Sequence, residues 1–372
     1  MRLVQTESAP DGARLAWDVS GGRGGAPLLR AGVRLDGRYR DAISAAGVTR
    51  IVVDDEETEG IDVRPPLADA VRKEAVSRLG TLIEQGRQAL RRGERLPYRV
   101  IGAAVGVASL LADEVLAAPG GPVTLVGCGG AQGHEAQHPV DVTVLGLLVA
   151  RRLFGERGRV AAGGRRSSAG LDDALRRLAV GLVLHDIALE EACDPVQVEQ
   201  GAIADPPVDE LRVHVERGHG ALPLRIVSAH AAAVVRYHHE RWQGSGPAGL
   251  VRERIPQFAR IAAVADTYAA LTGDRPGIPA VPAHVAIAAI ARGAGTLFDP
   301  EVVEMFRWTV APYPVGSEVT LSNGFSGVVA AVPSQTPHRP SVRLLRDPQG
   351  ARITPREVAL HRLRGLAVAD AA

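Results

Sequence analysis

The spacing of apolar residues changes along this chain, and that change constrains the fold more than any other feature. Over residues 1–66, short alternating segments such as RLAWDV and TRIVVDD are separated by glycine-rich turns. Alternation with a period of two is typical of β-strands. From Leu67 to about residue 308, Ala, Leu, Arg and Glu dominate and the apolar residues recur mostly at helical spacing. We therefore predict a small β-rich module followed by a long helical part.

The pattern changes again near residue 310. The segments VGSEVTLSNGFSGVVAAVP and PSVRLLRDPQGARI alternate and contain an Asn-Gly turn and a Pro-Gln-Gly turn. We expect four or five short strands in a barrel-like C-terminal module over 311–372. The helical part is divided into a connector over 67–120 and a helical domain over 121–310. The predicted fold class is multidomain and mainly α, with small β-rich modules at both ends.

Composition limits the class of partner. The chain has 372 residues and a formal net charge of only +1, which favours neither a nucleic acid polymer nor a membrane surface. Cys128 and Cys193 form neither a disulfide framework nor a CxxC metal motif, so we expect a reducing compartment, the cytoplasm. The longest apolar stretch, VIGAAVGVASLLA from Val100, is short and interrupted by glycine, and it does not predict a membrane span.

Two glycine-rich stretches are interpreted as connections. PGGPVTLVGCGGAQG lacks the GK[ST] ending of a P-loop and the GxGxxG spacing of a dinucleotide site, so we predict a linker. GERGRVAAGGRRSSAG, within residues 155–170, has the composition of a solvated, mobile loop between two helices.

The stretch LVLHDIALEE places an adjacent histidine and aspartate at the end of an apolar run. Apolar positions of the predicted helix step by four, three and four residues: Leu171, Leu175, Leu178 and Leu182. The next step of three reaches His185, which therefore lies on the buried stripe. Asp186 follows about 100° further round, so both side chains reach one point beside the helix, as metal ligands do. The alternative is a buried neutral histidine beside a capping aspartate.

Further residues of the same chemical types occur in similar settings. They are His138 in HPVDVTVLGLLVARRLF, His214 in LRVHVERGHG, the adjacent His238 and His239 after AAAVV, and Asp266 in ARIAAVADTYAAL. Taken singly, each is more typical of a structural or solvated role. Taken together, five imidazoles and two carboxylates would be costly to bury unpaired, whereas two divalent cations would use them all. We therefore predict one shared metal site.

At residues 134 to about 308 the chain resembles the HD-GYP family, a branch of the HD-domain metal-dependent phosphohydrolases that degrade the second messenger cyclic di-GMP. The resemblance is carried by HHERWQGSGPAGL, IPQFARIAAVADTYAALTGDRP and GTLFDPEVVEMF. The β-type segments at both ends are similar to small modules that flank this domain. The resemblance implies a helical HD-type bundle with a di-metal centre, in which a hydroxide bridging the metals attacks a phosphodiester.

The resemblance also implies the ligands. One metal would be held by His138, His185, Asp186 and Asp266, and the second by Asp186, His214, His238 and His239, with Asp186 bridging. Nitrogen and oxygen ligands without thiolate suit Fe, Mn, Co or Zn better than Mg or Ca, and the resemblance favours iron or manganese. Three-metal members carry an extra glutamate where this chain has His134, so two metals are predicted.

The chain departs from the family on the substrate side. The family's HDIGK reads HDIAL, so Leu189 replaces a lysine, and GSGPAGL lacks the tyrosine of GYP and follows Gln243 in place of an acidic residue. Losing one transition-state donor typically lowers a rate by about 10²–10³. The segment DRPGI keeps Arg275, which can bind a phosphate, but has Gly277 and Ile278 where the family has aromatic and basic residues.

Two functions therefore stay open. The first is a phosphodiesterase that hydrolyses cyclic di-GMP or a related nucleotide, with Asp186 at its catalytic centre and Arg275 as the phosphate clamp. The second is a catalytically weak or inactive HD-GYP module that binds nucleotide or a signalling protein partner. A helical domain without metal is a more distant alternative, and the sequence leaves a homodimer open.

Overall fold

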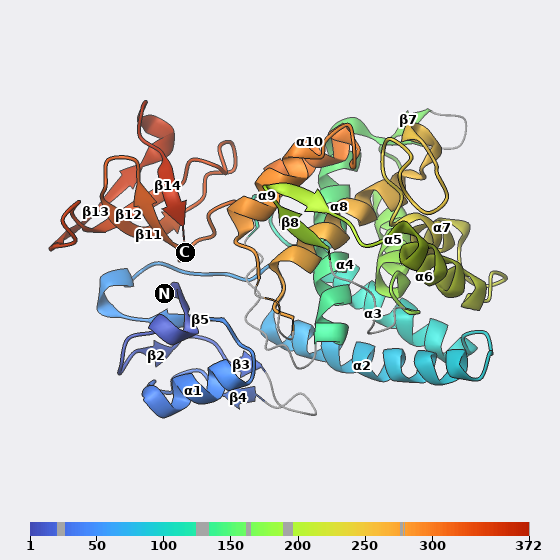
Figure 1. Ribbon diagram of the computed structural model, residues 1–372, viewed down its shortest axis with the longest axis horizontal. Helices are drawn as coiled ribbons and strands as arrows, with labels where there is room; N and C mark the ends of the chain where they lie inside the picture. The colour runs from blue at the N-terminus through green and yellow to red at the C-terminus, as the bar shows by residue number, and fades with distance from the viewer. Residues whose placement is uncertain are drawn as a thin grey trace.

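The computed structural model describes residues 1–20, 27–123, 134–160, 165–188, 196–275, 278 and 280–371. A helical body makes up most of the molecule, and two β-rich modules lie together at one end of it (Figure 1). The two chain termini lie near each other in this β-rich end. The fold is mainly α with β modules at both ends of the sequence, which confirms the predicted fold class.

The N-terminal module is built on a small antiparallel sheet. Its strands are ordered β1 (Arg2–Gln5), β5 (Arg50–Asp54) and β2 (Arg14–Leu15), and β3 (Val19–Ser20) pairs with β4 (Pro27–Leu29). The helix α1 (Gly37–Ala45) was not predicted from the sequence. It begins because the side chain of Asp36 accepts a hydrogen bond from the backbone N–H of Tyr39, at 2.9 Å, which caps the first turn.

The segment predicted as a helical connector forms α2 (Asp69–Arg91) and α3 (Tyr98–Ala117). Both helices contribute side chains to the main hydrophobic core, which continues across residue 120 into the later helices. By length and composition α3 could cross a membrane, because it extends beyond the apolar stretch counted in the sequence. In this fold it packs against α2, α4 and α5 and buries one face, including Val100, Val107 and Leu111.

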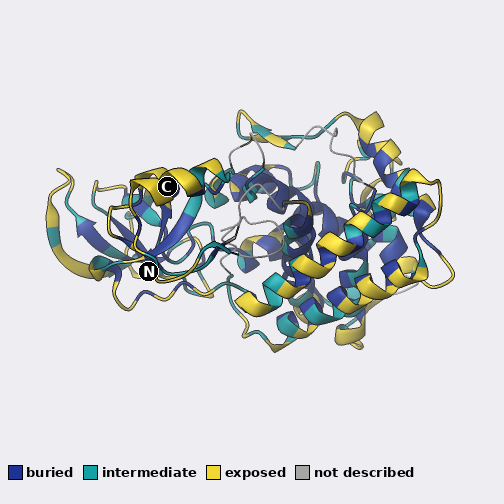
Figure 2. Ribbon diagram, turned by 90° about the horizontal axis from the view of Figure 1, so that it is seen from below, coloured by how far each residue is buried: buried dark blue, intermediate teal, exposed yellow. Residues whose placement is uncertain are grey.

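The helical body continues through seven further helices of the described residues: α4 (His134–Arg157), α5 (Leu171–Leu184), α6 (Val208–Ala221), α7 (Ala229–Tyr237), α8 (Gln257–Thr272), α9 (Ala283–Arg292) and α10 (Pro300–Thr309). Helix α8 is central, since it contacts α4, α7, α9 and α10 and is buried over nearly its whole length. Figure 2 shows buried segments in the interior of the helical body and exposed ones on its outside. Close packing depends on small residues. A Cβ on Gly181 of α5 would lie 2.7 Å from Cβ of Val234 in α7, so α5 and α7 pack at a distance that only glycine permits.

Short strands interrupt the helical part. Strands β6 (Arg159–Val160) and β7 (Arg166–Ser167) pair within the stretch that was predicted as a mobile loop. Strands β8 (Gln197–Glu199) and β9 (Ala202–Ala204) form a hairpin that was not predicted. Its two turn residues have positive φ, 49° at Gln200 and 79° at Gly201, as a tight two-residue hairpin turn requires. Short 3₁₀ helices lie at Thr6–Ser8, Glu56–Thr58, Arg252–Arg254 and Leu360–Arg362. The predicted linker around Cys128, and Cys193, lie outside the described residues.

The C-terminal module is a five-stranded antiparallel sheet, in agreement with the predicted strands. The strands are β10 (Glu318–Leu321), β11 (Ser326–Ala331), β12 (Ser341–Arg346), β13 (Arg352–Ala359) and β14 (Val368–Ala371), and their order is β13-β12-β11-β10-β14. The predicted turns connect β10 to β11 at Asn323 and Gly324, and β12 to β13 at Pro348 to Gly350. The buried core of this module includes Val319 and Val342.

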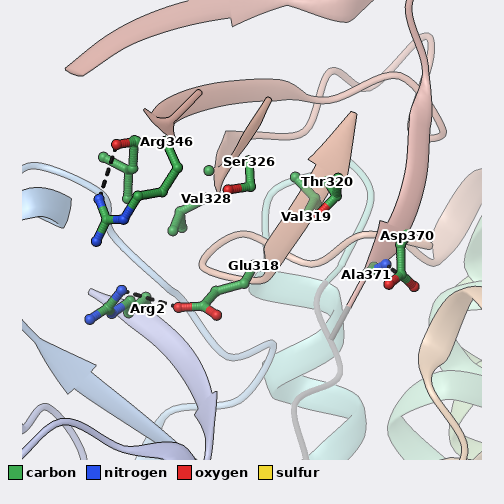
Figure 3. Close-up of a pocket in the computed structure, with 11 residues that line it drawn as sticks. Arg2, Glu318, Val319, Thr320, Ser326, Val328, Arg346, Asp370 and Ala371 are labelled. Atoms are coloured by element: carbon green, nitrogen blue, oxygen red, sulfur yellow. Dashed lines mark hydrogen bonds and ion pairs between the residues drawn. The ribbon is translucent and has the colours of Figure 1, made fainter. Parts of the chain in front are cut away.

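The two β modules contact each other directly. The backbone N–H of Leu3 donates to the carbonyl of Gly316 at 2.8 Å. Arg2 in β1 reaches the carboxylate of Glu318 in β10 at 3.1 Å (Figure 3), and Arg346 pairs with Glu57 at 3.0 Å. These contacts join segments that are more than 250 residues apart in sequence. The domain boundaries at residues 66, 120 and 310 stay a prediction.

Candidate metal centre

The histidine and aspartate of HDIAL lie in the turn that directly follows α5. His185 is fully buried, as expected from its place on the apolar stripe. Its Nδ1 lies 2.7 Å from the carbonyl oxygen of Leu182. Because a carbonyl only accepts hydrogen bonds, Nδ1 must carry the proton in this contact. The neutral ring then presents Nε2 as a lone pair, which is the form that binds a metal.

A first group of possible ligands gathers around this Nε2 atom. It lies 3.3 Å from Oδ2 of Asp186 and 3.6 Å from Oδ1 of Asp266, which comes from the middle of α8. His138 of α4 lies opposite, with Nε2 at 3.0 Å from the Asp266 oxygen and 3.5 Å from the Asp186 oxygen. One ligand atom from each of these four residues lies within 4.8 Å of the others. Three segments of the chain therefore meet at one point.

A second group lies on the other side of Asp186. Its Oδ1 atom is 3.2 Å from Nε2 of His214 in α6 and 3.5 Å from Nε2 of His238, which follows α7. His239 completes the group. One ligand atom from each of its four residues again lies within 4.8 Å of the others. Nδ1 of His238 lies 3.0 Å from the carbonyl of Val234, so its Nε2 also faces the site. The two oxygens of Asp186 therefore face two different sets of histidines.

The carboxylates dominate the protonation of the first group. Burial lowers the pKa of His138, but hydrogen bonds with Asp186 and Asp266 outweigh it, so the pKa is raised. Burial also lowers the pKa of His185, but the negative charge of Asp186 outweighs it, and this pKa is raised well above its usual range. Without a bound cation, the two aspartates therefore favour the protonated form of both imidazoles.

The same attraction between imidazole and carboxylate lowers the pKa of the two aspartates. Burial would raise the pKa of Asp186, but the charge of His185 and the hydrogen bond with His138 hold it well below its usual range. Burial would likewise raise the pKa of Asp266, but hydrogen bonding with His138 holds this pKa well below normal. Burial lowers the pKa of His239 strongly, which leaves its ring neutral. The site thus offers two ionised carboxylates and at least one neutral imidazole.

These residues fit divalent cations. Among the described residues, Nε2 of His185 is buried and makes no hydrogen bond, although two carboxylate oxygens lie close to it. Leaving a buried polar atom unsatisfied is costly, and a cation would use its lone pair. The ligand set of imidazole and carboxylate, without thiolate, suits Fe, Mn, Co or Zn. The seven residues predicted from the sequence as ligands all belong to these two groups.

Comparisons with known proteins agree with this geometry. Residues 175–302 match the HD domain, and residues 318–371 match a KOW domain associated with the HD domain. The chain is 35% identical over 229 residues to cyclic di-GMP phosphodiesterase PA4108 of Pseudomonas aeruginosa, covering 60% of this chain and 51% of that protein. The helical domain belongs to the HD-GYP family.

Other relatives match a shorter region. The cyclic di-GMP phosphodiesterase response regulator RpfG of Xanthomonas campestris is 35% identical over 137 residues, which are 36% of each protein. A cyclic di-GMP phosphodiesterase of Vibrio cholerae is 36% identical over 133 residues, covering 33% of this chain and 27% of that protein. This chain thus spans about half the length of the P. aeruginosa protein and about a third or less of the other two.

In this HD-GYP domain, the glycine-rich loop GSGPAGL folds back onto the paired histidines. Glu240 directly follows His239, and its buried carboxylate accepts hydrogen bonds from the backbone N–H groups of Ala248 at 2.6 Å and Leu250 at 2.8 Å. A Cβ on Gly246 would lie 2.5 Å from Cα of Glu240, so glycine permits this close approach. The loop therefore helps to fix the backbone that carries His238 and His239.

A second contact that holds the turn of His238 and His239 was also not predicted from the sequence. Arg241 is buried and forms two hydrogen bonds with Asp205, at 2.7 and 2.6 Å, and its guanidinium lies 5.3 Å from the ring centroid of Phe298. Nearby, Arg260 of α8 pairs with Asp299, the residue that caps α10, at 2.5 Å. Charged residues directly after the two histidines were the available signal, but the sequence does not identify their partners.

Arg275, the predicted phosphate clamp, is not a member of either ligand group. Arg275 follows the end of α8, and its backbone pairs with Ile278. The preceding residue, Asp274, is buried and accepts a 2.6 Å hydrogen bond from the hydroxyl of Thr49 in the N-terminal module. Leu189 and Gly277 lie outside the described residues, as does the side chain of His134.

Proposed function

We propose that this chain is a metal-dependent phosphodiesterase of the HD-GYP type that hydrolyses cyclic di-GMP or a related nucleotide. The observation that carries the proposal is the position of Asp186, whose two carboxylate oxygens face separate groups of histidines at 3.2 to 3.5 Å. This arrangement suits two cations that share one bridging carboxylate. The names of the relatives support the substrate class.

The ligand residues form two proposed cation positions. His138, His185 and Asp266 would hold one cation and His214, His238 and His239 the other, with Asp186 shared. When bound, the pair of cations would supply Lewis acidity, which activates water and neutralises charge on the phosphodiester oxygens. The backbone carbonyls of Leu182 and Val234 keep the Nε2 atoms of their histidines directed into the site. Iron or manganese is proposed for both positions.

Arg275 is proposed to position the substrate. A guanidinium can hold two phosphate oxygens at once, which fixes the phosphodiester as well as balancing its charge. Asp274 and the hydroxyl of Thr49 would hold the first residues of the loop that carries this arginine. The proposed domain division keeps the boundaries predicted from the sequence, and the proposed location is the cytoplasm.

Leu189 favours a second candidate function. Leucine cannot donate a hydrogen bond, and the GSGPAGL loop lacks the tyrosine that the family places there. A module with these changes could keep its metals for stability while binding a nucleotide or a signalling protein partner. A homodimer is compatible with either function.

Hydrolysis of cyclic di-GMP, measured after anoxic reconstitution with iron or manganese, tests the two candidates. The blank is the double variant His185→Ala, Asp186→Ala, and metal content is recorded on the same samples. Metal-dependent turnover above the blank supports the phosphodiesterase. Two metals per chain without turnover support the binding module, and a chain that takes up no metal contradicts both.

A further inference from the structure

A cavity lies between the HD-GYP domain and the C-terminal module, and none of the seven candidate metal ligands lines it. Its volume is about 660 Å³, which falls within the range of small-ligand sites, about 300–1,000 Å³. Apolar residues of α9, α10 and the C-terminal module line it: Ile287, Ala291, Val303, Leu360, Leu366 and Val368. Ligand sites occur preferentially at such junctions between domains. The cavity is therefore large enough, and suitably placed, for an organic ligand.

Flat aromatic groups form part of its wall. Tyr313 and His284 are stacked, with ring centroids 5.6 Å apart and an angle of 29° between their planes. Trp308 is a further lining residue, and the guanidinium of Arg152 lies 5.8 Å from its ring centroid. A planar heteroaromatic ring can stack on surfaces of this kind without a specific hydrogen-bond pattern.

The charged residues of the wall favour an anion. Arg307 is exposed at the cavity and makes no ion pair with any described residue. Arg339 is held in place because its guanidinium donates to the carbonyls of Leu360, Leu363 and Leu366. His338 lies beside both arginines. Burial lowers the pKa of His338, and the positive charges of Arg339 and Arg307 lower it further.

Acidic groups near the cavity do not cancel this positive charge. Glu304, which lines the cavity, is paired with Arg157 at 3.2 Å. Burial lowers the pKa of His284, which belongs to the aromatic wall, and the negative charge of Asp370 opposes this shift. The smaller cavity in Figure 3 differs in this respect, because both of its arginines have carboxylate partners: Arg2 is paired with Glu318 and Arg346 with Glu57.

We propose that the larger cavity binds a mononucleotide, with the base against the aromatic wall and the phosphate facing Arg307 and His338. Arg307 supplies the cation that no other described residue neutralises, and Tyr313, His284 and Trp308 supply the flat surfaces. This site is separate from the metal centre and does not depend on hydrolysis there. Because its wall comes from both parts, an occupant would contact the HD-GYP domain and the C-terminal module together.

Isothermal titration of the full chain with GMP and with AMP tests this proposal. We expect saturable binding of one nucleotide per chain by at least one of them, and at least tenfold weaker binding of guanosine, adenosine and inorganic phosphate. Arg307→Ala should weaken binding at least tenfold, and Tyr313→Leu should weaken it with little change in Tm. The matched control Arg225→Ala removes an exposed arginine that does not line the cavity, so its affinity should be unchanged.

The double variant His185→Ala, Asp186→Ala separates this site from the metal centre. Retained nucleotide binding in that variant supports a second site, whether or not the wild-type chain hydrolyses cyclic di-GMP. Loss of binding in that variant overturns the proposal, because the nucleotide would then occupy the metal centre. Absence of saturable binding, or equal affinities of Arg307→Ala and Arg225→Ala, also overturns it.

Discussion

Arg241 and Asp205 meet through two hydrogen bonds, at 2.7 and 2.6 Å, in which the guanidinium holds both carboxylate oxygens. Only 4% of the arginine side chain is exposed. Asp205 lies directly after the β8–β9 hairpin, and Arg241 lies two residues after His239. The pair therefore fixes the histidine turn to a segment 36 residues earlier in the chain.

Replacing Arg241 by Met should be strongly destabilising. It removes the partner of Asp205 and two charge-assisted hydrogen bonds, and breaking such a buried pair costs about 3–5 kcal/mol. Since Asp205 is partly exposed, we expect the lower end of this range, measured as the free energy of unfolding in urea. Arg176→Met breaks an exposed pair with Asp113 and should change stability by less than about 1 kcal/mol. Equal losses in the two variants would count against a special role for Arg241.

Gly246→Ala tests the close approach of the glycine-rich loop. The new Cβ would lie 2.5 Å from Cα of Glu240, so the loop or the histidine turn must move. We expect a loss of about 1–3 kcal/mol in stability and a lower metal content per chain. Gly220→Ala in α6 meets no atom within 4 Å, and it should leave both quantities nearly unchanged. Full metal content in Gly246→Ala would show that the loop does not position the ligands.

Features set by local spacing were predictable from the sequence. The apolar repeat of α5 placed His185 on the buried stripe, and the Asn323-Gly324 pair marked the turn between β10 and β11. Helix α1 was missed because its residues lack an apolar repeat and depend on the Asp36 cap. The β8–β9 hairpin was missed because Gln200, at its turn, is an unusual residue for positive φ.

Non-local contacts were not predictable in the same way. Periodicity gave a possible metal site at His185 and Asp186, but it could not show that Asp266 on α8 reaches the same point. The shared site was predicted from the cost of burying so many ionisable groups unpaired, and the division of the ligands between two metals came from the family resemblance. Glu240 shows the limit most clearly, since a carboxylate beside two histidines suggests a ligand, whereas here it accepts hydrogen bonds from two backbone N–H groups.

Thr49→Val tests the contact between the N-terminal module and the loop of Arg275. The hydroxyl of Thr49 donates to Oδ1 of Asp274, whose other oxygen is buried without a hydrogen bond. Losing the donor should cost about 1–3 kcal/mol, seen as a lower Tm, and should raise KM by displacing Arg275. In Thr81→Val the lost hydroxyl bonds only to an exposed helical carbonyl, that of Ser77, so little change is expected. An unchanged KM in Thr49→Val would separate the contact from substrate binding.

Metal affinity should depend on pH through His138 and His185. Both have raised pKa values in the metal-free site, and a protonated imidazole cannot bind a metal. Apparent affinity should therefore fall as pH decreases toward 6.5, by up to about tenfold per pH unit for each proton displaced. Competition with a chelator of known affinity measures this dependence. A pH-independent affinity would contradict the raised pKa values.

The same shifts predict the stability of the metal-free protein. A raised histidine pKa contributes stability that is fully present below the unfolded value, about 6.5, and is lost as pH rises through the folded value. The Tm of metal-free protein should therefore fall as pH rises above 6.5 and this contribution is lost, whereas metal-loaded protein should keep its Tm, because the cations replace the protons. Parallel Tm profiles for the two forms would contradict this exchange of protons for metal.

Leu189→Lys tests whether the loss of one cation limits the rate. The family places lysine at this position, and one restored donor to a developing negative charge can raise a rate by about 10²–10³. We expect faster hydrolysis of cyclic di-GMP with unchanged metal content. Leu224→Lys adds the same charge at an exposed position between α6 and α7, so it should not raise the rate. If neither variant is faster than wild type, the missing lysine does not limit catalysis, and the binding module becomes the better account of this chain.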